Sequence, residues 1–233
     1  SSTNEIQNLS VSITGDTLYI SAGNYIIVPG ISDTNYPPMD IDGNNYDTVH
    51  IGTQIWMKQN LNVSRYNTGS PIPLVTGTNW KDLTTGARTY YNNDSSTNAP
   101  IYGALYNRFA TMGDSICPTG WHVPTDAEWG ILETYLGGST GAGNKLKEIG
   151  TSTWNSNTGA TNEVGFTARG GGYRSGSSGN FGDLKNYGLF SSLNPNPPAG
   201  DQSHMDMQGG SGNTLVHTSL GERTGISVRC LRD

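Results

Sequence analysis

Glycine is spread along almost the whole chain, where it accounts for 32 of 233 residues, and this limits what the chain can fold into. Glycine weakens helices, and the Asn, Ser and Thr residues that accompany it favour turns over helix interiors. Only 14% of the residues are charged and 33% are hydrophobic. A helical bundle and a coiled coil are therefore excluded. Five Trp, twelve Tyr and four Phe supply enough large side chains for a core, which argues against disorder.

The charge balance excludes one class of partner. The formal net charge is −6 with only 13 Lys and Arg, so the basic surface of a nucleic-acid-binding protein is missing. No apolar run approaches the roughly 20 residues that span a bilayer, so we expect no membrane-spanning segment. The sequence starts at Ser1 without a methionine, which fits a processed form of a secreted or cell-surface protein, with or without a lipid anchor before processing.

Two cysteines, Cys117 and Cys230, lie 113 positions apart. In a reducing cytosol they would be free thiols. In an exported domain they could close a very long loop and stabilise the fold by roughly 4–5 kcal/mol in the chain-entropy model. The low-charge surface rich in Gly, Asn, Ser and Thr is typical of exported proteins and favours the disulfide.

Residues 1–34 differ from the rest of the chain. Apolar residues alternate at Leu9, Val11 and Ile13 and again at Leu18 and Ile20, which predicts short strands with a turn between them. A third strand follows in 25–28. Three such strands are too few for an independent core, so we expect them to pack on the main domain or on copies of themselves in a homo-oligomer. The segment resembles the strand repeats that precede binding domains in exported Bacteroidetes proteins and in some phage fibres.

We place a linker at 29–38 and the main domain at 35–233. A turn at Asp42-Gly43 predicts hairpins in the first part of this domain. Segment 64–100 is polar and predicts surface loops. The last residues, 226–231, alternate and predict a final strand.

Two helices are expected in the main domain. Helical spacing of apolar residues predicts one helix over 102–112. The second begins at a capping box of Thr125 and Glu128 and ends at Gly137-Gly138. Its buried stripe is expected to contain Ile131, Leu132, Tyr135 and Leu136. A short further turn is expected at 144–149.

The main domain resembles the Fibrobacter succinogenes major paralogous domain family from about residue 38 to 233. The central block is the most specific part of the match, and the departure from the family lies at about 193–222. The segments that carry the resemblance are Asp40-Ile41-Asp42-Gly43-Asn44, Gln54-Ile55-Trp56-Met57, Cys117-Pro118-Thr119-Gly120-Trp121-His122-Val123-Pro124-Thr125-Asp126-Ala127-Glu128-Trp129, Gly170-Gly171-Gly172-Tyr173-Arg174 and Ser227-Val228-Arg229-Cys230-Leu231-Arg232-Asp233.

This resemblance implies an α+β domain similar to the C-type lectin-like fold and to the formylglycine-generating-enzyme-like group. It also implies a disulfide between the helical region and the final strand, where Cys117 and Cys230 lie. Members are mostly bacterial, exported or lipid-anchored. The resemblance therefore says more about the fold than about an activity.

We expect no enzymatic activity. The thiol chemistry of the formylglycine-generating group would consume the only two cysteines, and no G-x-S-x-G motif is present. His122, inside the family signature, is expected to be a partly buried side chain hydrogen-bonded to backbone near the start of the second helix.

A metal-dependent enzyme is the sharpest alternative. His204 and Asp206 would share one face of a strand, and His217 across a hairpin would complete a two-histidine, one-carboxylate ligand set if it lay opposite His204. A register slip of one residue would place His217 on the other face. Met205 and Met207 are expected to be buried, which leaves His204, Asp206 and Gln208 exposed.

Calcium is the one cofactor that we leave open. Asp40, Asp42 and Asn44 imitate the start of a calcium loop, but Ile51 occupies the position of the bidentate glutamate, so a hairpin turn is the better interpretation. Asp and Asn elsewhere in the loops could still bind calcium.

The function that we predict is non-catalytic recognition of an extracellular protein or glycan at the bacterial cell surface, or adhesion to it. Tyr173 and Arg174 lie in a Gly/Ser-rich stretch, where aromatic and Arg side chains typically form a recognition surface. The alternative is that Tyr187 and Phe190 belong to the core and the Gly/Ser run is a spacer. A structural component of a surface or phage fibre, assembled through 1–34, is the alternative. The predicted contact residues are Tyr173, Arg174, His204, Asp206, Gln208 and His217.

Overall fold

The computed structural model describes residues 9–11, 17–20, 24–27, 37–113, 115–194, 200–210 and 215–233. The chain forms two units, Ser1–Pro38 and Met39–Asp233. In the first unit, strands β1 (Leu9–Val11), β2 (Thr17–Ile20) and β3 (Asn24–Ile27) pair antiparallel in that order, as the alternation predicts. The predicted turn between the first two strands and most of the predicted linker lie outside the described residues.

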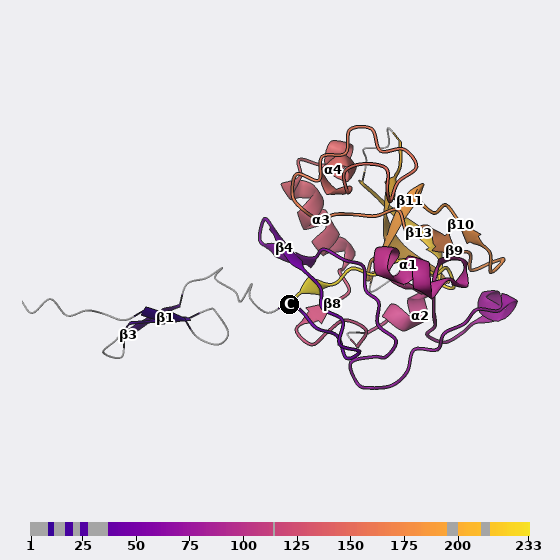
Figure 1. Ribbon diagram of the computed structural model, residues 1–233, viewed down its shortest axis with the longest axis horizontal. Helices are drawn as coiled ribbons and strands as arrows, with labels where there is room; N and C mark the ends of the chain where they lie inside the picture. Colours follow the sequence, from indigo (N-terminus) through magenta and orange to yellow (C-terminus); the bar gives the residue numbers. More distant parts are fainter. Residues whose placement is uncertain are drawn as a thin grey trace, which may run out of the picture. The chain divides into compact units, whose positions relative to one another are not determined.

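The second unit is an α+β domain that combines small sheets with short helices (Figure 1). Its finer likeness to a C-type lectin stays a prediction. The helices are η1 (Thr78–Asp82), η2 (Tyr91–Asn93), α1 (Ser95–Tyr102), α2 (Arg108–Thr111), α3 (Asp126–Tyr135) and α4 (Ser139–Leu146). The strands are β4 (Thr48–Ile51), β5 (Gln54–Met57), β6 (Arg88–Thr89), β7 (Leu105–Tyr106), β8 (Trp121–His122), β9 (Tyr173–Arg174), β10 (Phe181–Gly182), β11 (Tyr187–Ser191), β12 (Asp201–Gln208), β13 (Leu215–Gly221) and β14 (Leu231–Arg232).

The two ends of the domain meet in one sheet with the order β4–β5–β14–β8. Leu231 in β14 lies opposite Trp56 of β5 on one side and His122 of β8 on the other. The hairpin of β4 and β5 lies in the region where hairpins are predicted, but it turns at residues 52–53 and not at Asp42-Gly43. Of the predicted final strand over 226–231, only Leu231 belongs to β14.

The segment that leads into β14 connects several separate parts of the chain through backbone hydrogen bonds. Ile226 exchanges two with Tyr106, of 2.8 and 3.0 Å. The carbonyl of Val228 accepts from the Leu61 amide at 2.8 Å, and that of Cys230 from the Met57 amide at 3.1 Å. Because the segment is buried, each pairing satisfies backbone groups that water does not reach.

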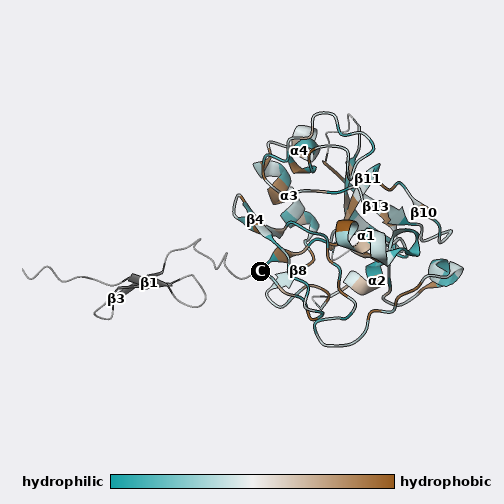
Figure 2. Ribbon diagram, in the orientation of Figure 1, coloured by the Kyte–Doolittle hydropathy of each residue, from teal (hydrophilic) through white to brown (hydrophobic). Residues whose placement is uncertain are grey.

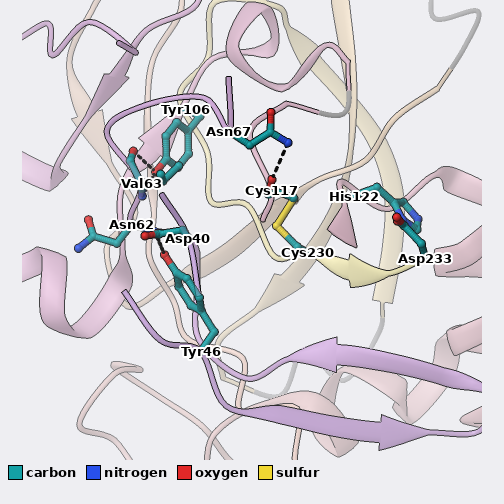
Figure 3. The surroundings of a disulfide bond; sticks show 10 residues. All are labelled: Asp40, Tyr46, Asn62, Val63, Asn67, Tyr106, Cys117, His122, Cys230 and Asp233. Atoms are coloured by element: carbon teal, nitrogen blue, oxygen red, sulfur yellow. Dashed lines mark hydrogen bonds and ion pairs between the residues drawn. A yellow bond between two sulfur atoms is a disulfide. The ribbon is translucent and has the colours of Figure 1, made fainter. Parts of the chain in front are cut away.

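A disulfide joins Cys117 to Cys230, with 6.0 Å between their Cα atoms (Figure 3). Both cysteines belong to a buried cluster that includes Val123 and Val228. The carbonyl of Cys117 also accepts a hydrogen bond of 3.4 Å from the Asn67 side chain. The pairing that the family resemblance implies is therefore present.

A buried arginine lies next to this disulfide in the sequence. The Arg229 guanidinium lies 4.4 Å from the centroid of the Phe166 ring and 5.3 Å from that of Phe190, both cation–π distances. It donates to Asn60 Oδ1 at 2.6 Å and to the carbonyl of Phe166. Burial lowers the pKa of Arg229 to about 9, so the side chain is still charged at neutral pH.

The largest core cluster lies between helices α3 and α4 and one face of the sheet β11–β12–β13. Trp129 and Leu132 contribute from α3, and Met205 and Met207 from β12. The Trp56 and Trp129 ring centroids are 4.6 Å apart. Burial of the two methionines confirms the predicted inner face of this strand.

Helix α3 begins at the predicted capping box. Thr125 Oγ1 accepts from the Glu128 amide, and the Glu128 side chain accepts from the Thr125 amide at 2.8 Å. The predicted buried stripe is wrong at Ile131 and Tyr135, which are 49% and 59% exposed. The face with Trp129 and Leu132 is buried instead, and Figure 2 shows α3 with both hydrophilic and hydrophobic colouring.

The predicted helix over 102–112 is wrong. This region contains the end of α1, strand β7 and the short helix α2. Gly103 ends α1 with a positive φ of 71°, and a Cβ there would lie 2.6 Å from the Leu61 carbonyl oxygen. Pairing of β7 with β6 overrides the helical spacing. The predicted short turn at 144–149 is also displaced, since α4 covers Ser139–Leu146.

None of the helices in the described part of the chain combines the length and the apolar character that crossing a bilayer requires.

Removal of the disulfide should lower the stability of the domain strongly. Replacement of both Cys117 and Cys230 by Ala should lower the free energy of unfolding by about 4–5 kcal/mol, because the bond closes a loop with a sequence separation of 113 residues. Urea titrations of the wild type with and without reductant, and of the double variant, measure this change. Reduction should destabilise the wild type and leave the variant unchanged; equal stability of all samples would contradict the prediction.

Candidate functional site

The outer face of the sheet β11–β12–β13 forms the floor of an open pocket of about 600 Å3. Strand β9 and the turn after β13 contribute to its walls. The lining residues are Tyr173, Ser175, Gly176, Ser177, Asp183, Tyr187, Leu189, Gly200, His204, Asp206, Thr218, Ser219, Leu220, Gly221, Glu222, Arg223 and Thr224.

Strand alternation places His204 and Asp206 on this outer face. Their neighbours Met205 and Met207 point into the core, and side chains along a strand alternate between faces. His204 lies between Ser191 of β11 and Thr218 of β13 in the register. The predicted common face of His204 and Asp206 is therefore confirmed.

This face concentrates buried polar atoms that lack a hydrogen-bond partner among the described residues. They are Ser191 Oγ, Gln202 Oε1, His204 Nδ1 and Asp206 Oδ1. His204 is only 2% exposed, which corrects the prediction that it is exposed. Buried polar groups in folded proteins are nearly always hydrogen-bonded, so such a group beside a pocket points to a polar ligand or ordered water.

The same two residues have strongly shifted pKa values. Burial lowers the pKa of His204 from 6.5 to about 4, and a hydrogen bond with the Gln202 backbone offsets only part of this effect. Burial raises the pKa of Asp206 from 3.8 to about 6, against the effect of a hydrogen bond with the Gln208 side chain. At neutral pH the floor of the pocket therefore has a neutral imidazole and an ionised carboxylate. Shifts of this kind cluster at functional sites.

The walls of the pocket carry two tyrosines, Tyr173 and Tyr187. Burial raises the pKa of Tyr173, and the neighbouring Asp183 raises it further through its charge and a hydrogen bond. Asp183 adopts a positive φ of 58°, a conformation that Asp tolerates better than most residues. Tyr173 is thus one predicted contact residue that lies in the pocket.

Glu222 and Arg223 complete the wall after β13. Sequence reasoning does not select them, because they follow a strand in a turn that carries no motif. The alternation of polar residues at Gln202, His204 and Asp206 is the signal that could have identified the pocket floor.

Arg174 does not belong to the exposed recognition surface that its sequence context suggests. It is 2% exposed and donates hydrogen bonds of 2.6 Å to the Val75 carbonyl and 2.7 Å to that of Gly77. Its guanidinium lies 4.8 Å from the Trp80 ring centroid. Its prediction as a contact residue is wrong, because the side chain is used to hold loop 75–77 against β9.

The strand register separates His217 from His204 and Asp206. His217 lies opposite Met205, whereas His204 lies opposite Thr218, so the two histidines are on different faces. His217 instead pairs with Glu133 of α3 at 3.4 Å. The predicted ligand set is therefore not assembled, and the described residues contain no cluster of three His, Cys, Asp or Glu side chains suited to a metal ion.

Gln208 is exposed, as predicted, but it does not line the pocket. It lies opposite Tyr187 at the end of the pairing between β11 and β12. Its carbonyl accepts a hydrogen bond of 3.0 Å from Lys147 Nζ.

The calcium-like segment at residues 40–44 is a turn, as interpreted from the sequence. The Asp40 carboxylate accepts a hydrogen bond of 2.9 Å from the Asn44 backbone amide. It also accepts one of 2.5 Å from the Tyr46 hydroxyl (Figure 3). Asp42 pairs with Arg65 at 2.7 Å. These oxygens therefore serve the fold, and calcium binding elsewhere stays a prediction.

His122 is held between two carboxylates, not by backbone as predicted. Its Nδ1 is 2.7 Å from Asp233 Oδ1 and its Nε2 is 2.9 Å from Glu128 Oε1. Desolvation alone would lower the pKa of His122, but its hydrogen bonds with Asp233 and Glu128 outweigh it and raise the pKa. Figure 3 shows the His122 ring next to Asp233. The cluster fixes the last residues of the domain to the start of α3.

Comparison with models of known protein families shows to which family the chain belongs. The profile of the Fibrobacter succinogenes major domain matches residues 49–232. The chain belongs to this family. Searches of curated proteins and of solved structures gave no match.

The segments that carry the resemblance to this family build the scaffold in this Fibrobacter succinogenes major domain. Cys117 and Cys230 form the disulfide, Arg174 and Arg229 are buried, and His122 joins α3 to the end of the domain. The floor of the pocket comes mainly from β12 and β13, which lie within the matched residues. The departure from the family at about 193–222 stays a prediction. Tyr173, from one of these segments, also lines the pocket, so the segments that build the scaffold contribute to the pocket wall as well.

The pKa shifts on the pocket floor predict opposing effects of pH on stability. In the folded protein Asp206 keeps its proton up to a higher pH than in the unfolded chain. Its contribution to the free energy of unfolding therefore falls as the pH rises from about 4 to 6. His204 binds its proton less readily in the folded protein than in the unfolded chain. Its contribution to the free energy of unfolding therefore rises between about pH 4 and 6.5. Replacement Asp206→Asn should therefore make the stability rise more steeply with pH over this window, by about 1–2 kcal/mol once solvent screening of this partly exposed carboxylate is allowed for.

Urea unfolding of the wild type, Asp206→Asn and His204→Gln at several pH values between 4 and 7 tests this prediction. His204→Gln should show the reverse change, with stability that falls as the pH rises towards 6. Parallel pH profiles for all three proteins would show that neither group is perturbed.

Proposed function

We propose that this domain is a non-catalytic recognition module of an exported bacterial protein, and that it binds a glycan in the pocket above the sheet β11–β12–β13. The protein ligand that the sequence also allows would need a peptide segment that enters the same pocket. The observation that carries the proposal is His204, which is 2% exposed, faces the pocket and has a buried Nδ1 without a partner among the described residues.

The composition of the pocket supports a hydroxylated ligand. Asp206 and Asp183 supply carboxylate acceptors, and Thr218 supplies a hydroxyl group. Tyr173 and Tyr187 add aromatic surface, against which a sugar ring can pack. Small-ligand sites typically combine such apolar surfaces with a few polar groups in a concave pocket of a few hundred Å3.

The disulfide supports an extracellular location at the cell surface, since such bonds persist mainly in oxidising compartments. It also supports a non-catalytic role, because both thiols are used in the scaffold and neither is left for thiol chemistry.

Glycan binding by the full chain can be tested on a printed array that carries neutral, amino and acidic glycans. The glycan that binds best should lose at least about tenfold in affinity with Asp206→Asn and with His204→Ala, because each variant removes a buried group that faces the pocket. Isothermal titration calorimetry with that glycan measures the change.

His217→Gln is the matched control, since it lies on the same hairpin but on the opposite face. It should bind as the wild type does. A loss with His217→Gln and none with Asp206→Asn would place the contact surface on the other face and refute the pocket. Near-UV circular dichroism of each variant verifies that the fold is kept.

A structural role in a surface or phage fibre is the second candidate. The observation that favours it is the separate three-stranded sheet of the first unit, which is too small to provide a core by itself. If this role holds, the full chain should be an oligomer in solution and a chain without residues 1–34 should be a monomer. Light scattering of both proteins tests it; a monomeric full chain would contradict it.

A further inference from the structure

The pocket on the β12 face is distinguished by its charge. Three carboxylates line it, those of Asp183, Asp206 and Glu222, against one guanidinium, that of Arg223. The three come from separate places: the loop after β10, strand β12 and the turn after β13. A concave site with this balance attracts cations and repels anions.

The one guanidinium is already engaged by the protein. Arg223 Nε donates a hydrogen bond of 2.7 Å to the Leu83 carbonyl. Its Nη2 lies 4.0 Å from Glu222 Oε1, so that charge is partly matched within the wall. Asp183 and Asp206 form no ion pair with another described residue.

His204 does not supply the missing positive charge. It is 98% buried, and burial lowers the pKa of its imidazole to about 4, so the ring is neutral at pH 7. A neutral ring offers one donor and one acceptor nitrogen. Its buried Nδ1, which has no partner among the described residues, can therefore hydrogen-bond a hydroxyl group of a ligand.

Of the three carboxylates that line the pocket, that of Asp206 would be stabilised most by a bound cation. Its Oδ1 is buried with no partner among the described residues, and burial raises the pKa of the carboxyl to about 6. An ionised carboxylate is thus held at pH 7 in a place that disfavours charge. An ammonium group at hydrogen-bond distance would offset this cost with a charge-assisted hydrogen bond. The titratable or charged groups that share the pocket with Asp206 are Tyr173, Asp183, Tyr187, His204, Glu222 and Arg223.

We infer that the pocket prefers a hydroxylated primary amine, such as an amino sugar, with the ammonium group beside Asp206 and a hydroxyl group at His204 Nδ1. This inference rests on the proposed function, since it names the chemical class of the glycan. Neutral sugars are weaker ligands because they leave the carboxylate without a counter-charge. Acidic sugars are the weakest because the carboxylates repel them.

Three probes that differ only at C6 of one sugar ring test the preference: 6-amino-6-deoxyglucose, glucose and glucuronic acid, each also in the galacto and manno configurations. Saturation-transfer NMR titrations with the full chain at pH 7 measure their dissociation constants. In at least one configuration, the amine should bind at least tenfold more tightly than the alcohol, and the acid should bind more weakly than both.

Asp206→Asn should reduce the preference for the amine over the alcohol to less than threefold, while His217→Gln should leave it unchanged. Glu222→Gln is a second variant that removes charge from the wall, and a smaller reduction is expected there. If Asp206→Asn does not fold, Glu222→Gln alone must still reduce the preference.

The outcomes separate this inference from the proposed function. Binding without preference between amine and alcohol, or a preference that the variants leave unchanged, would overturn the inference and keep glycan recognition. No binding of any of these probes, together with no binding on the glycan array, would overturn both.

Discussion

The rest of the domain depends on how the segment 225–232 is held. It crosses the interior and exchanges backbone hydrogen bonds with parts of the chain that are far apart in sequence, then ends as β14 between β5 and β8. Arg229 holds it by cation–π contacts and Cys230 by a covalent bond to Cys117. The disulfide reduces the entropy of the unfolded chain, whereas the arginine satisfies buried carbonyl groups in the folded one. Together they allow a chain with short strands and many glycines to keep one structure.

Arg174 and Arg229 have the same structural role in two different parts of the domain. Each guanidinium is buried, lies over aromatic rings and donates to backbone carbonyls of irregular segments. Loops that are buried or half-buried leave carbonyl groups without partners, and the five donors of one arginine can satisfy several of them. Both arginines lie in the segments that carry the family resemblance. We therefore interpret these segments as the means by which the loops of the domain are fixed.

The pocket exists because the two faces of the sheet β11–β12–β13 carry different kinds of side chain. The inner face packs Phe190, Met205 and Met207 against α3. The outer face has polar side chains whose buried atoms are not all paired among the described residues. Apolar side chains on this face would be more favourable for folding than buried polar groups without partners. The polar face therefore lowers the stability of the domain. Such costs are typical of sites that bind ligands.

Local signals in the sequence determined the capping box of α3, the inner face of β12, the hairpin of β4 and β5 and the common face of His204 and Asp206, because each depends on residues close to one another in the chain. The family resemblance added the disulfide. The tertiary structure alone decided that 102–112 is not one helix, that Arg174 is buried, that His217 faces away from His204 and that Glu222 closes the pocket wall. These depend on strand register and on contacts between distant segments, and a shift of one residue, which no local pattern excludes, reverses which face a side chain occupies.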